Sequence, residues 1–258
     1  MNTEVNRTGT AKGTGTEVGS DPATDAGGGA DAGGAVHEGH APVTWRYDAA
    51  CLDRLTERAL ALAERPGRTL IGIAGEPGSG KSTLAEHLLS SVEARRPGLA
   101  AAVSMDGFHL AQRVIDARGH GPRKGAIDTF DAHGFVAALR RTRDETATTV
   151  WWPEFRRELE EPVAGAVEVA PAHRLVVVDG NFLLSTRAPW DQAAGLLTET
   201  WFLDADGPAR RDRLTARYVR YGFTPEAARA KTDGVDEVTS RRIRLDAHRA
   251  DLILTEGQ

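Results

Sequence analysis

Hydrophobic and polar residues follow two kinds of pattern along this chain, and together they predict strands and helices in alternation. Continuous apolar runs at 69–75 and 174–180 predict strands that are buried on both faces of a sheet. Between Asp48 and Pro66 the apolar side chains instead recur every three or four residues, as in an amphipathic helix. Further strands are predicted at 99–105, 148–155, 199–205 and 250–256, a hairpin-like segment at 163–169, and helices that end near 96, start at 131, or cover 207–220 and 225–246. This order predicts an α/β fold with a doubly wound, mainly parallel sheet.

Two segments need a separate prediction. The stretch around 107–130 carries no sustained apolar period, so we expect a short irregular insertion there. Trp151 and Trp152 are neighbours in a predicted strand, so their side chains should point to opposite faces. Because aromatic side chains mostly serve packing, we expect both tryptophans to pack in the core.

The first 42 residues differ in composition from the rest of the chain. They are rich in Gly, Ala, Thr and Asp, and residues 1–40 carry a net charge of −4 out of a total of −5. A segment with so few large apolar side chains cannot bury enough surface to offset the entropy lost on ordering. We therefore predict a disordered tail over 1–42 and one folded domain over 43–258.

Composition also excludes several classes of protein. Cys51 is the only cysteine, so neither an intramolecular disulfide nor a Cys-based zinc site can form. The apolar runs are too short to span a bilayer, and the chain does not begin with the pattern of a secretory signal. The nearly neutral folded part disfavours nonspecific binding to nucleic acid. We expect a cytoplasmic protein without membrane or nucleic-acid partners, and a homodimer is the default expectation for its assembly.

A phosphate-binding loop is the most specific motif in the sequence. GEPGSGKST at 75–83 fits the pattern G-x-x-x-x-G-K-[ST], with a predicted strand before it and a helix after it. The glycines let backbone N–H groups surround a phosphate at the helix N-terminus, Lys81 reaches the β- and γ-phosphates, and the Ser82 hydroxyl suits Mg²⁺. The residues predicted to bind the nucleotide here are Gly75, Gly78, Ser79, Gly80, Lys81, Ser82 and Thr83.

The loop alone leaves three classes of nucleotide-binding protein open: a phosphotransferase, a switch NTPase and a motor ATPase. None of the three asparagines is followed by lysine, so the Asn-Lys-x-Asp motif that reads guanine is missing. Motor ATPases usually end their second acidic strand in paired acids, whereas the strand at 174–180 carries one, Asp179. Both observations favour the phosphotransferase.

Three further features fit a kinase that acts on a small molecule. Asp106 and Asp179 each follow a predicted strand, and parallel strands bring their carboxyl ends to the edge that holds the phosphate loop. Four arginines at spacings of three and four occupy one face of the helix 207–220, which suits contact with polyphosphate. Each feature has a simpler reading, because the two Asp-Gly pairs also suit turns and an arginine face is often merely solvated. The face consists of Arg210, Arg213, Arg217 and Arg220.

Taken together, five segments resemble one family. The chain from about Thr69 to Leu254 is similar to the phosphoribulokinase/uridine kinase superfamily of P-loop kinases, and in particular to its bacterial nucleoside/nucleotide-kinase-like branch, related to type I pantothenate kinase. Apart from the phosphate loop, the resemblance rests on SMDGFH at 104–109, RKGAIDTFD at 123–131, WWPEFRRELEEPVAGAVEV at 151–169, VVVDGNFLL at 176–184 and RLTARYVRYGFTPEAA at 213–228.

The resemblance implies a P-loop kinase domain of the nucleoside monophosphate kinase-like type over 43–258, with an Arg-rich helical lid. It implies ATP- and Mg²⁺-dependent phosphorylation of a hydroxyl on a small molecule, with Asp106 as the catalytic aspartate and with Lys81 and Arg217 acting on the transferring phosphoryl group. Arg213 is expected at the nucleotide, and Ser82 with Asp179 at Mg²⁺. The resemblance further places His109, Arg123, Lys124 and Phe130 at the acceptor pocket.

Three positions depart from the pattern of this branch. Asp179 stands where relatives commonly carry Glu, so it is one methylene shorter and could reach Mg²⁺ through water. Arg156 replaces an acid in the Phe-Asp-Arg pattern, which predicts an acceptor with more acidic groups and places Arg156 among the substrate residues. Asp236 stands where relatives often carry Asn, in a segment that could meet the adenine.

The sequence therefore predicts an ATP-dependent kinase for a nucleoside-, pantothenate- or sugar-like acceptor, with sugar phosphates also open. Asp106 is expected to orient the acceptor hydroxyl, since a loose transition state needs positioning more than deprotonation. The alternative is a nucleotide-binding regulatory protein without efficient phosphotransfer, for which the departures at Asp179 and Arg156 are the only support.

Overall fold

The computed structural model describes residues 41–256, and these form an α/β domain around a six-stranded sheet. The strand order is β1-β8-β7-β2-β6-β3, and every neighbouring pair is parallel, so the predicted fold class is confirmed. The predicted tail lies outside the described residues except for its last two positions. The strands are β1 Val43–Tyr47, β2 Thr69–Gly75, β3 Ala100–Ser104, β6 Leu175–Gly180, β7 Glu199–Asp204 and β8 Leu252–Glu256.

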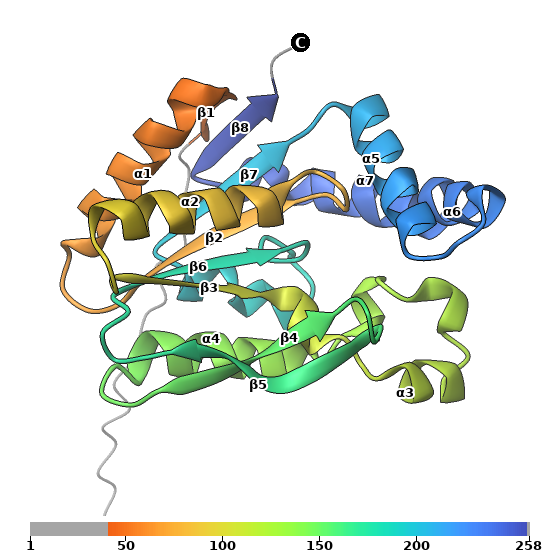
Figure 1. Ribbon diagram of the computed structural model, residues 1–258, viewed down its shortest axis with the longest axis horizontal. Helices are drawn as coiled ribbons and strands as arrows, with labels where there is room; N and C mark the ends of the chain where they lie inside the picture. The colour runs from red at the N-terminus through yellow and green to blue at the C-terminus, as the bar shows by residue number, and fades with distance from the viewer. Residues whose placement is uncertain (1–40, 257–258) are drawn as a thin grey trace, which may run out of the picture. The chain divides into compact units, whose positions relative to one another are not determined.

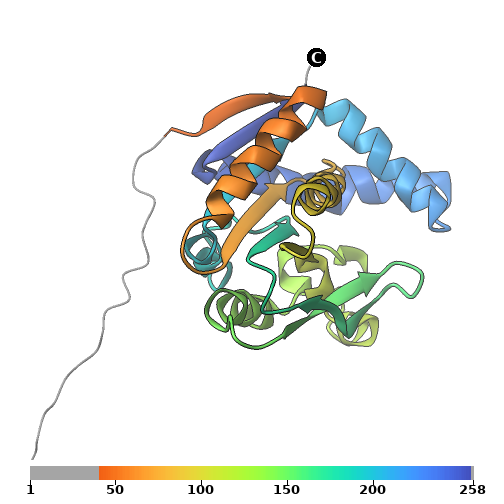
Figure 2. The same ribbon diagram turned by 60° about the vertical axis from the view of Figure 1, so that its left-hand side comes forward.

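Helices cover both faces of the sheet, as Figures 1 and 2 show. On one face α1 (Ala49–Ala63) and α2 (Lys81–Arg95) pack against side chains such as Ile71 and Ile73. On the other face α4 (Ala132–Asp144) and α7 (Glu237–Asp246) pack against Leu70, Val176 and Val178. Consecutive strand residues thus serve opposite cores, which explains why these strands read as continuous apolar runs.

A hairpin lies apart from the main sheet, on the side of α4 (Figure 1). Its strands β4 (Val150–Arg156) and β5 (Glu161–Val169) are antiparallel. Trp152 is fully buried and donates its Nε1–H to Thr142 Oγ1 at 2.8 Å. Trp151 points the other way and is 57% exposed, so the expectation that both tryptophans pack in the core is wrong for Trp151.

Helices at the end of the chain form an arm beside the phosphate loop. It contains α5 (Gly207–Arg220), α6 (Pro225–Lys231) and α7. The helix predicted over 225–246 is interrupted by a π-helical turn at Thr232–Asp236. Such turns are rare and often lie at functional sites.

The segment 105–130 is irregular, as expected. It contains the short helix α3 (Gln112–Ala117) and the 3₁₀ turns Met105–Phe108, Gly121–Arg123 and Ile127–Thr129. One strand was missed: β1 is an edge strand with mostly exposed side chains, so it lacks the apolar run that marks the buried strands. Within the described residues, no helix is long and apolar enough to cross a bilayer.

Candidate active site

The phosphate loop occupies the turn between β2 and α2. Gly78 and Gly80 have φ angles of 79° and 95°, which side chains disfavour, and a Cβ on Gly78 would lie 2.9 Å from the Arg210 backbone oxygen. Among the described residues, no side chain caps the first turn of α2. Its backbone N–H groups are therefore left to bind an anion, assisted by the helix dipole.

Two side chains of the loop fit a nucleotide. Ser79 Oγ is buried and has no hydrogen-bond partner within the described part of the chain, so it can serve a bound phosphate. Burial lowers the pKa of Lys81, while the carboxylates of Asp106 and Asp179 act in the opposite direction. A negatively charged phosphate would further favour the charged form of Lys81.

Ser82 and Asp179 meet beside this loop. The Ser82 hydroxyl, in the first turn of α2, donates to Asp179 Oδ2 at 2.8 Å, and Asp179 is 5% exposed at the end of β6. Burial raises the pKa of Asp179. The residues described contain no group of three His, Cys, Asp or Glu that could enclose a metal. Mg²⁺ needs only one or two protein oxygens when nucleotide phosphates and water complete its shell, so the pair fits that ion.

Asp106 lies at the neighbouring strand end. β3 pairs with β6 so that Ser104 stands opposite Asp179, and the 3₁₀ turn Met105–Phe108 follows directly. The Ser104 hydroxyl accepts a hydrogen bond from the Asp106 backbone N–H at 3.2 Å and caps this turn. Burial by itself would raise the pKa of Asp106, but the positive charges of His109, Lys81 and Arg157 outweigh it and hold the pKa below its usual value. Asp106 is thus a charged acceptor of hydrogen bonds.

His109 is fixed by the same turn. Its Nδ1–H donates to the Asp106 backbone oxygen at 2.7 Å, and its ring lies between Phe130 and Phe155, with centroids 4.0 Å and 4.7 Å away. Burial lowers the pKa of His109. The imidazole is therefore neutral at pH 7 and forms part of an aromatic wall.

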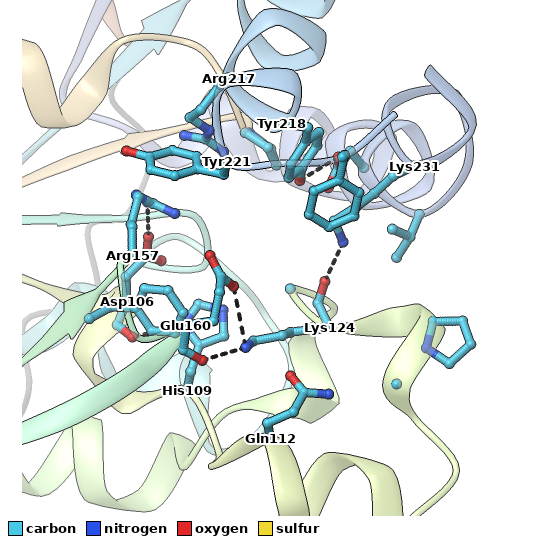
Figure 3. A pocket seen from close by; sticks show the side chains of 18 of the residues that line it. Asp106, His109, Gln112, Lys124, Arg157, Glu160, Arg217, Tyr218, Tyr221 and Lys231 are labelled. Atoms are coloured by element: carbon cyan, nitrogen blue, oxygen red, sulfur yellow. Dashed lines mark hydrogen bonds and ion pairs between the residues drawn. The ribbon is translucent and has the colours of Figure 1, made fainter. Parts of the chain in front are cut away.

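A cavity of about 600 Å³ opens beside Asp106, as Figure 3 shows. Its walls come mainly from the 105–130 segment, the β4–β5 hairpin, and three parts of the arm, namely α5, α6 and the π-helical turn. It combines aromatic rings with charged groups, which is typical of a site for a small polar ligand. The lining includes Asp106, His109, Lys124, Phe130, Phe155, Arg157, Glu160, Asn181, Arg217, Tyr218, Lys231 and Asp236.

The structure brings several predicted residues together around this cavity. Asp106, His109, Lys124, Phe130 and Arg217 all line it. The charges of Lys81 and Arg217 act on Asp106. The phosphate loop, the predicted catalytic carboxylate and one arginine of α5 therefore lie close enough for their charges to interact. The Lys124 ammonium donates to the Glu160 backbone oxygen at 2.7 Å (Figure 3).

Three other predicted residues are not among those that line this cavity. Arg156 pairs with Glu154 at 2.6 Å, Arg123 with Asp128 at 2.9 Å, and Arg213 with Glu256 at 2.8 Å. Each of these arginines is about half exposed. Their roles at the acceptor and the nucleotide remain predictions, and as they stand in this structure their charges are engaged elsewhere.

Arg157, the residue after Arg156, was missed. Its guanidinium donates from Nη2 to Asp106 Oδ2 at 3.2 Å (Figure 3). Arg157 also lines the cavity, as Phe155 does. Arg157 follows β4 directly, in a turn, and lines the cavity with Phe155, whereas Arg156 and Glu154 pair with each other. Its position two residues after Phe155 was the signal in the sequence that could have identified Arg157.

Arg210, the first arginine of α5, is buried in a group of ion pairs and does not line the cavity. It is 1% exposed, donates to the Pro77 backbone oxygen at 3.1 Å and pairs with Glu237 at 2.7 Å. Glu76 of the phosphate loop is equally buried, 3.5 Å from Arg210, and accepts from Arg244 at 2.7 Å. These ion pairs join the phosphate loop to α5 and α7.

Comparison with known proteins agrees with this geometry. No protein-family model matches the chain. The chain is 31% identical over 217 residues to the "putative uridine kinase C227.14" of Schizosaccharomyces pombe. This alignment covers 81% of this chain and 92% of that protein. It is 31% identical to protein YggC of Escherichia coli over 76% of this chain and 81% of YggC. A solved structure described as a putative fructose transport system kinase from Silicibacter sp. TM1040 superimposes with a TM-score of 0.71 at 34% identity, covering 78% of this chain and 98% of that one.

The parallel sheet, the phosphate loop and the carboxylates at the strand ends define the class of α/β P-loop kinases. Within that class, the chain belongs to the uridine kinase-like family. The resemblance read from the sequence is confirmed.

Proposed function

We propose that this protein transfers the γ-phosphoryl group of ATP to a hydroxyl of a small acceptor that binds in the cavity beside Asp106. One observation carries the proposal: Asp106 lies where the phosphate loop meets the cavity, with the charges of Lys81, Arg157 and Arg217 acting on it. A donor phosphate on the loop and an acceptor hydroxyl in the cavity would then meet at this carboxylate.

The donor side of the reaction uses the residues of the loop. The backbone N–H groups at the start of α2, Ser79 and Lys81 hold the triphosphate, while Ser82 and Asp179 hold Mg²⁺. The ion, when bound, supplies positive charge that neutralises the phosphate oxygens.

The acceptor side depends on Asp106. Its carboxylate accepts a hydrogen bond from the acceptor hydroxyl and directs that oxygen in line with the γ-phosphorus. The new phosphorus–oxygen bond forms as the bond to the β–γ bridging oxygen breaks, ADP leaves with that oxygen, and the hydroxyl proton passes to Asp106 and then to solvent. Arg157 and Arg217 stabilise the negative charge on the moving group.

The acceptor belongs to the range of nucleoside-, pantothenate- and sugar-like hydroxyl compounds. The rings that line the cavity and the charged groups between them support an acceptor of this size and polarity. The relatives named for uridine and fructose justify including both compounds in the test panel.

The test measures ADP release with Mg-ATP across nucleosides, pantothenate, sugars and sugar phosphates, for the wild type, Asp106→Asn and Asp53→Asn. Positioned acid–base groups contribute about 10²- to 10⁴-fold, so Asp106→Asn should lose transfer to that extent and keep ATP affinity. Asp53 is an exposed partner of Arg95, so Asp53→Asn should match the wild type. Release that no acceptor stimulates, or that Asp106→Asn leaves unchanged, would contradict the proposal and favour a nucleotide-binding regulator.

A further inference from the structure

The charges in the cavity form two groups. Those that act on Asp106 at neutral pH include Lys81, Arg157 and Arg217. Those that act on Lys231, the last residue of α6, come from Asp236, Glu160, Lys124 and Arg217. Arg217 acts on both. The cavity therefore has a transfer end at Asp106 and a second polar end at Lys231, and Figure 3 shows these two residues on different sides of it.

The ammonium group of Lys231 has few protein partners. Its Nζ donates to the Lys124 backbone oxygen at 3.0 Å and lies 5.3 Å from the Tyr218 ring centroid. Within residues 41–256 it forms no ion pair with a carboxylate. An ammonium group has three N–H donors, and within residues 41–256 Lys231 Nζ donates this one hydrogen bond.

The nearby carboxylates are already engaged. Asp236 accepts a hydrogen bond from the Tyr218 hydroxyl at 2.8 Å, and Glu160 lies 3.5 Å from the Lys124 ammonium. Burial lowers the pKa of Lys231, which means that its charge is poorly solvated in the empty cavity. A partly buried cation that forms no direct ion pair is stabilised when a ligand supplies an anion.

We propose that the phosphoryl acceptor carries an anionic group, either a phosphate monoester or a carboxylate, which binds Lys231 while its hydroxyl lies at Asp106. This inference rests on the proposed function. The donor phosphates bound at the phosphate loop repel a second anion from the transfer end, so an acceptor with a hydroxyl at one end and an anion at the other has a single favourable orientation. Tyr218 and Phe155 contact the part of the acceptor between the two groups.

Binding tests this directly, without turnover. Ligand pairs that differ in the anionic group are titrated calorimetrically into Asp106→Asn protein: a nucleoside and its 5′-monophosphate, a sugar and its monophosphate, pantothenol and pantothenate, glycerol and glycerate. We expect one anionic compound to bind at least tenfold more tightly than its neutral counterpart. The phosphate pairs and the carboxylate pairs distinguish the two kinds of anion.

Substitutions then assign the effect to Lys231. Adding Lys231→Gln should weaken binding of the anionic compound about 10- to 100-fold, as expected for one charge-assisted hydrogen bond, and should leave the neutral compound unchanged. Lys231→Arg should restore most of the affinity. Arg229→Gln, an exposed position on the same helix, should have no effect. An equal loss for both members of a pair would indicate a structural role and overturn the proposal.

The two proposals fail in different ways. ADP release that depends on a neutral acceptor in the wild type, together with weak binding of every anionic compound, overturns this inference and keeps the kinase. Tight, Lys231-dependent binding of an anion without ADP release keeps the anion site and contradicts the proposed transfer. Absence of binding for all pairs overturns the inference.

Discussion

Gly107 follows Asp106 directly, and the structure predicts that a larger residue at this position destabilises the protein. Its φ angle lies outside the left-handed region, so the requirement is spatial. A Cβ at this position would lie 2.2 Å from the Pro153 backbone oxygen and 2.6 Å from its carbonyl carbon. Both atoms belong to β4, which also carries Phe155 and leads into Arg157. Gly107 thus permits the close contact that brings the hairpin to the active site.

The cost of Gly107→Ala follows from these distances. Ordinary contacts between heavy atoms lie at about 3.5 Å, so the turn and β4 must separate by about 1 Å. Overpacking of this kind costs about 1–3 kcal/mol of unfolding free energy. For a domain of this size, each kcal/mol lowers Tm by about 2–4 °C. The same movement would lengthen the 3.2 Å contact between Arg157 and Asp106, and a misplacement of about 1 Å can reduce catalysis about 10²-fold.

Urea denaturation and the rate of acceptor-dependent ADP release measure the two effects. Gly195→Ala is the matched control, because a Cβ there would meet no atom within 4 Å and the backbone needs no positive φ. The control should change the unfolding free energy by no more than about 0.5 kcal/mol. If Gly107→Ala unfolds at the same urea concentration as the wild type and retains its rate, the packing argument for this turn is wrong.

Two further substitutions test the charges around the phosphate loop. A carboxyl whose pKa is raised on folding binds more protons in the folded state, so its ionisation lowers stability above the unfolded pKa of about 4. Asp179→Asn should therefore raise the unfolding free energy of the nucleotide-free protein at pH 7, and this gain should fade below about pH 4. Urea denaturation that shows the same gain at both pH values would contradict the assignment. Glu76→Ala removes a buried ion-pair partner of Arg210 and should lower the unfolding free energy by about 3–5 kcal/mol. Glu64→Ala, which breaks an exposed pair, should lower it by at most about 1 kcal/mol. Similar losses of unfolding free energy in both variants would refute the importance of the buried pair.

The sheet could be predicted from the sequence because buried parallel strands have a strong signal. β2 and β6 are continuous apolar runs, since their two faces serve different cores. β1 gave no such signal, because an edge strand with exposed side chains buries little surface. The π-helical turn was equally hidden, since one extra residue in a turn hardly alters the helical spacing of apolar positions.

The donor half of the site was predictable for a different reason. The phosphate loop is a continuous motif, and parallel strands necessarily bring their carboxyl ends to one edge. Asp106 and Asp179 could therefore be placed near Lys81 without knowing any loop conformation. In the structure both carboxylates lie close enough to Lys81 to favour its charged form, against the opposing effect of burial on its pKa.

The acceptor half of the site depends on which side chains of each element point into the cavity. The sequence alone did not decide this for Arg156 and Arg157. Arg156 and Arg157 are chemically identical neighbours, and a shift of one residue in the alternation exchanges their positions. In the structure the Phe155 ring lies against His109, and Arg157, in the turn that follows β4, reaches Asp106. The expectation of an acidic acceptor was drawn from Arg156, which pairs with Glu154. The same expectation now rests on Lys231, which is a stronger basis because Lys231 is more buried than Arg156 and lacks the carboxylate partner that Arg156 has.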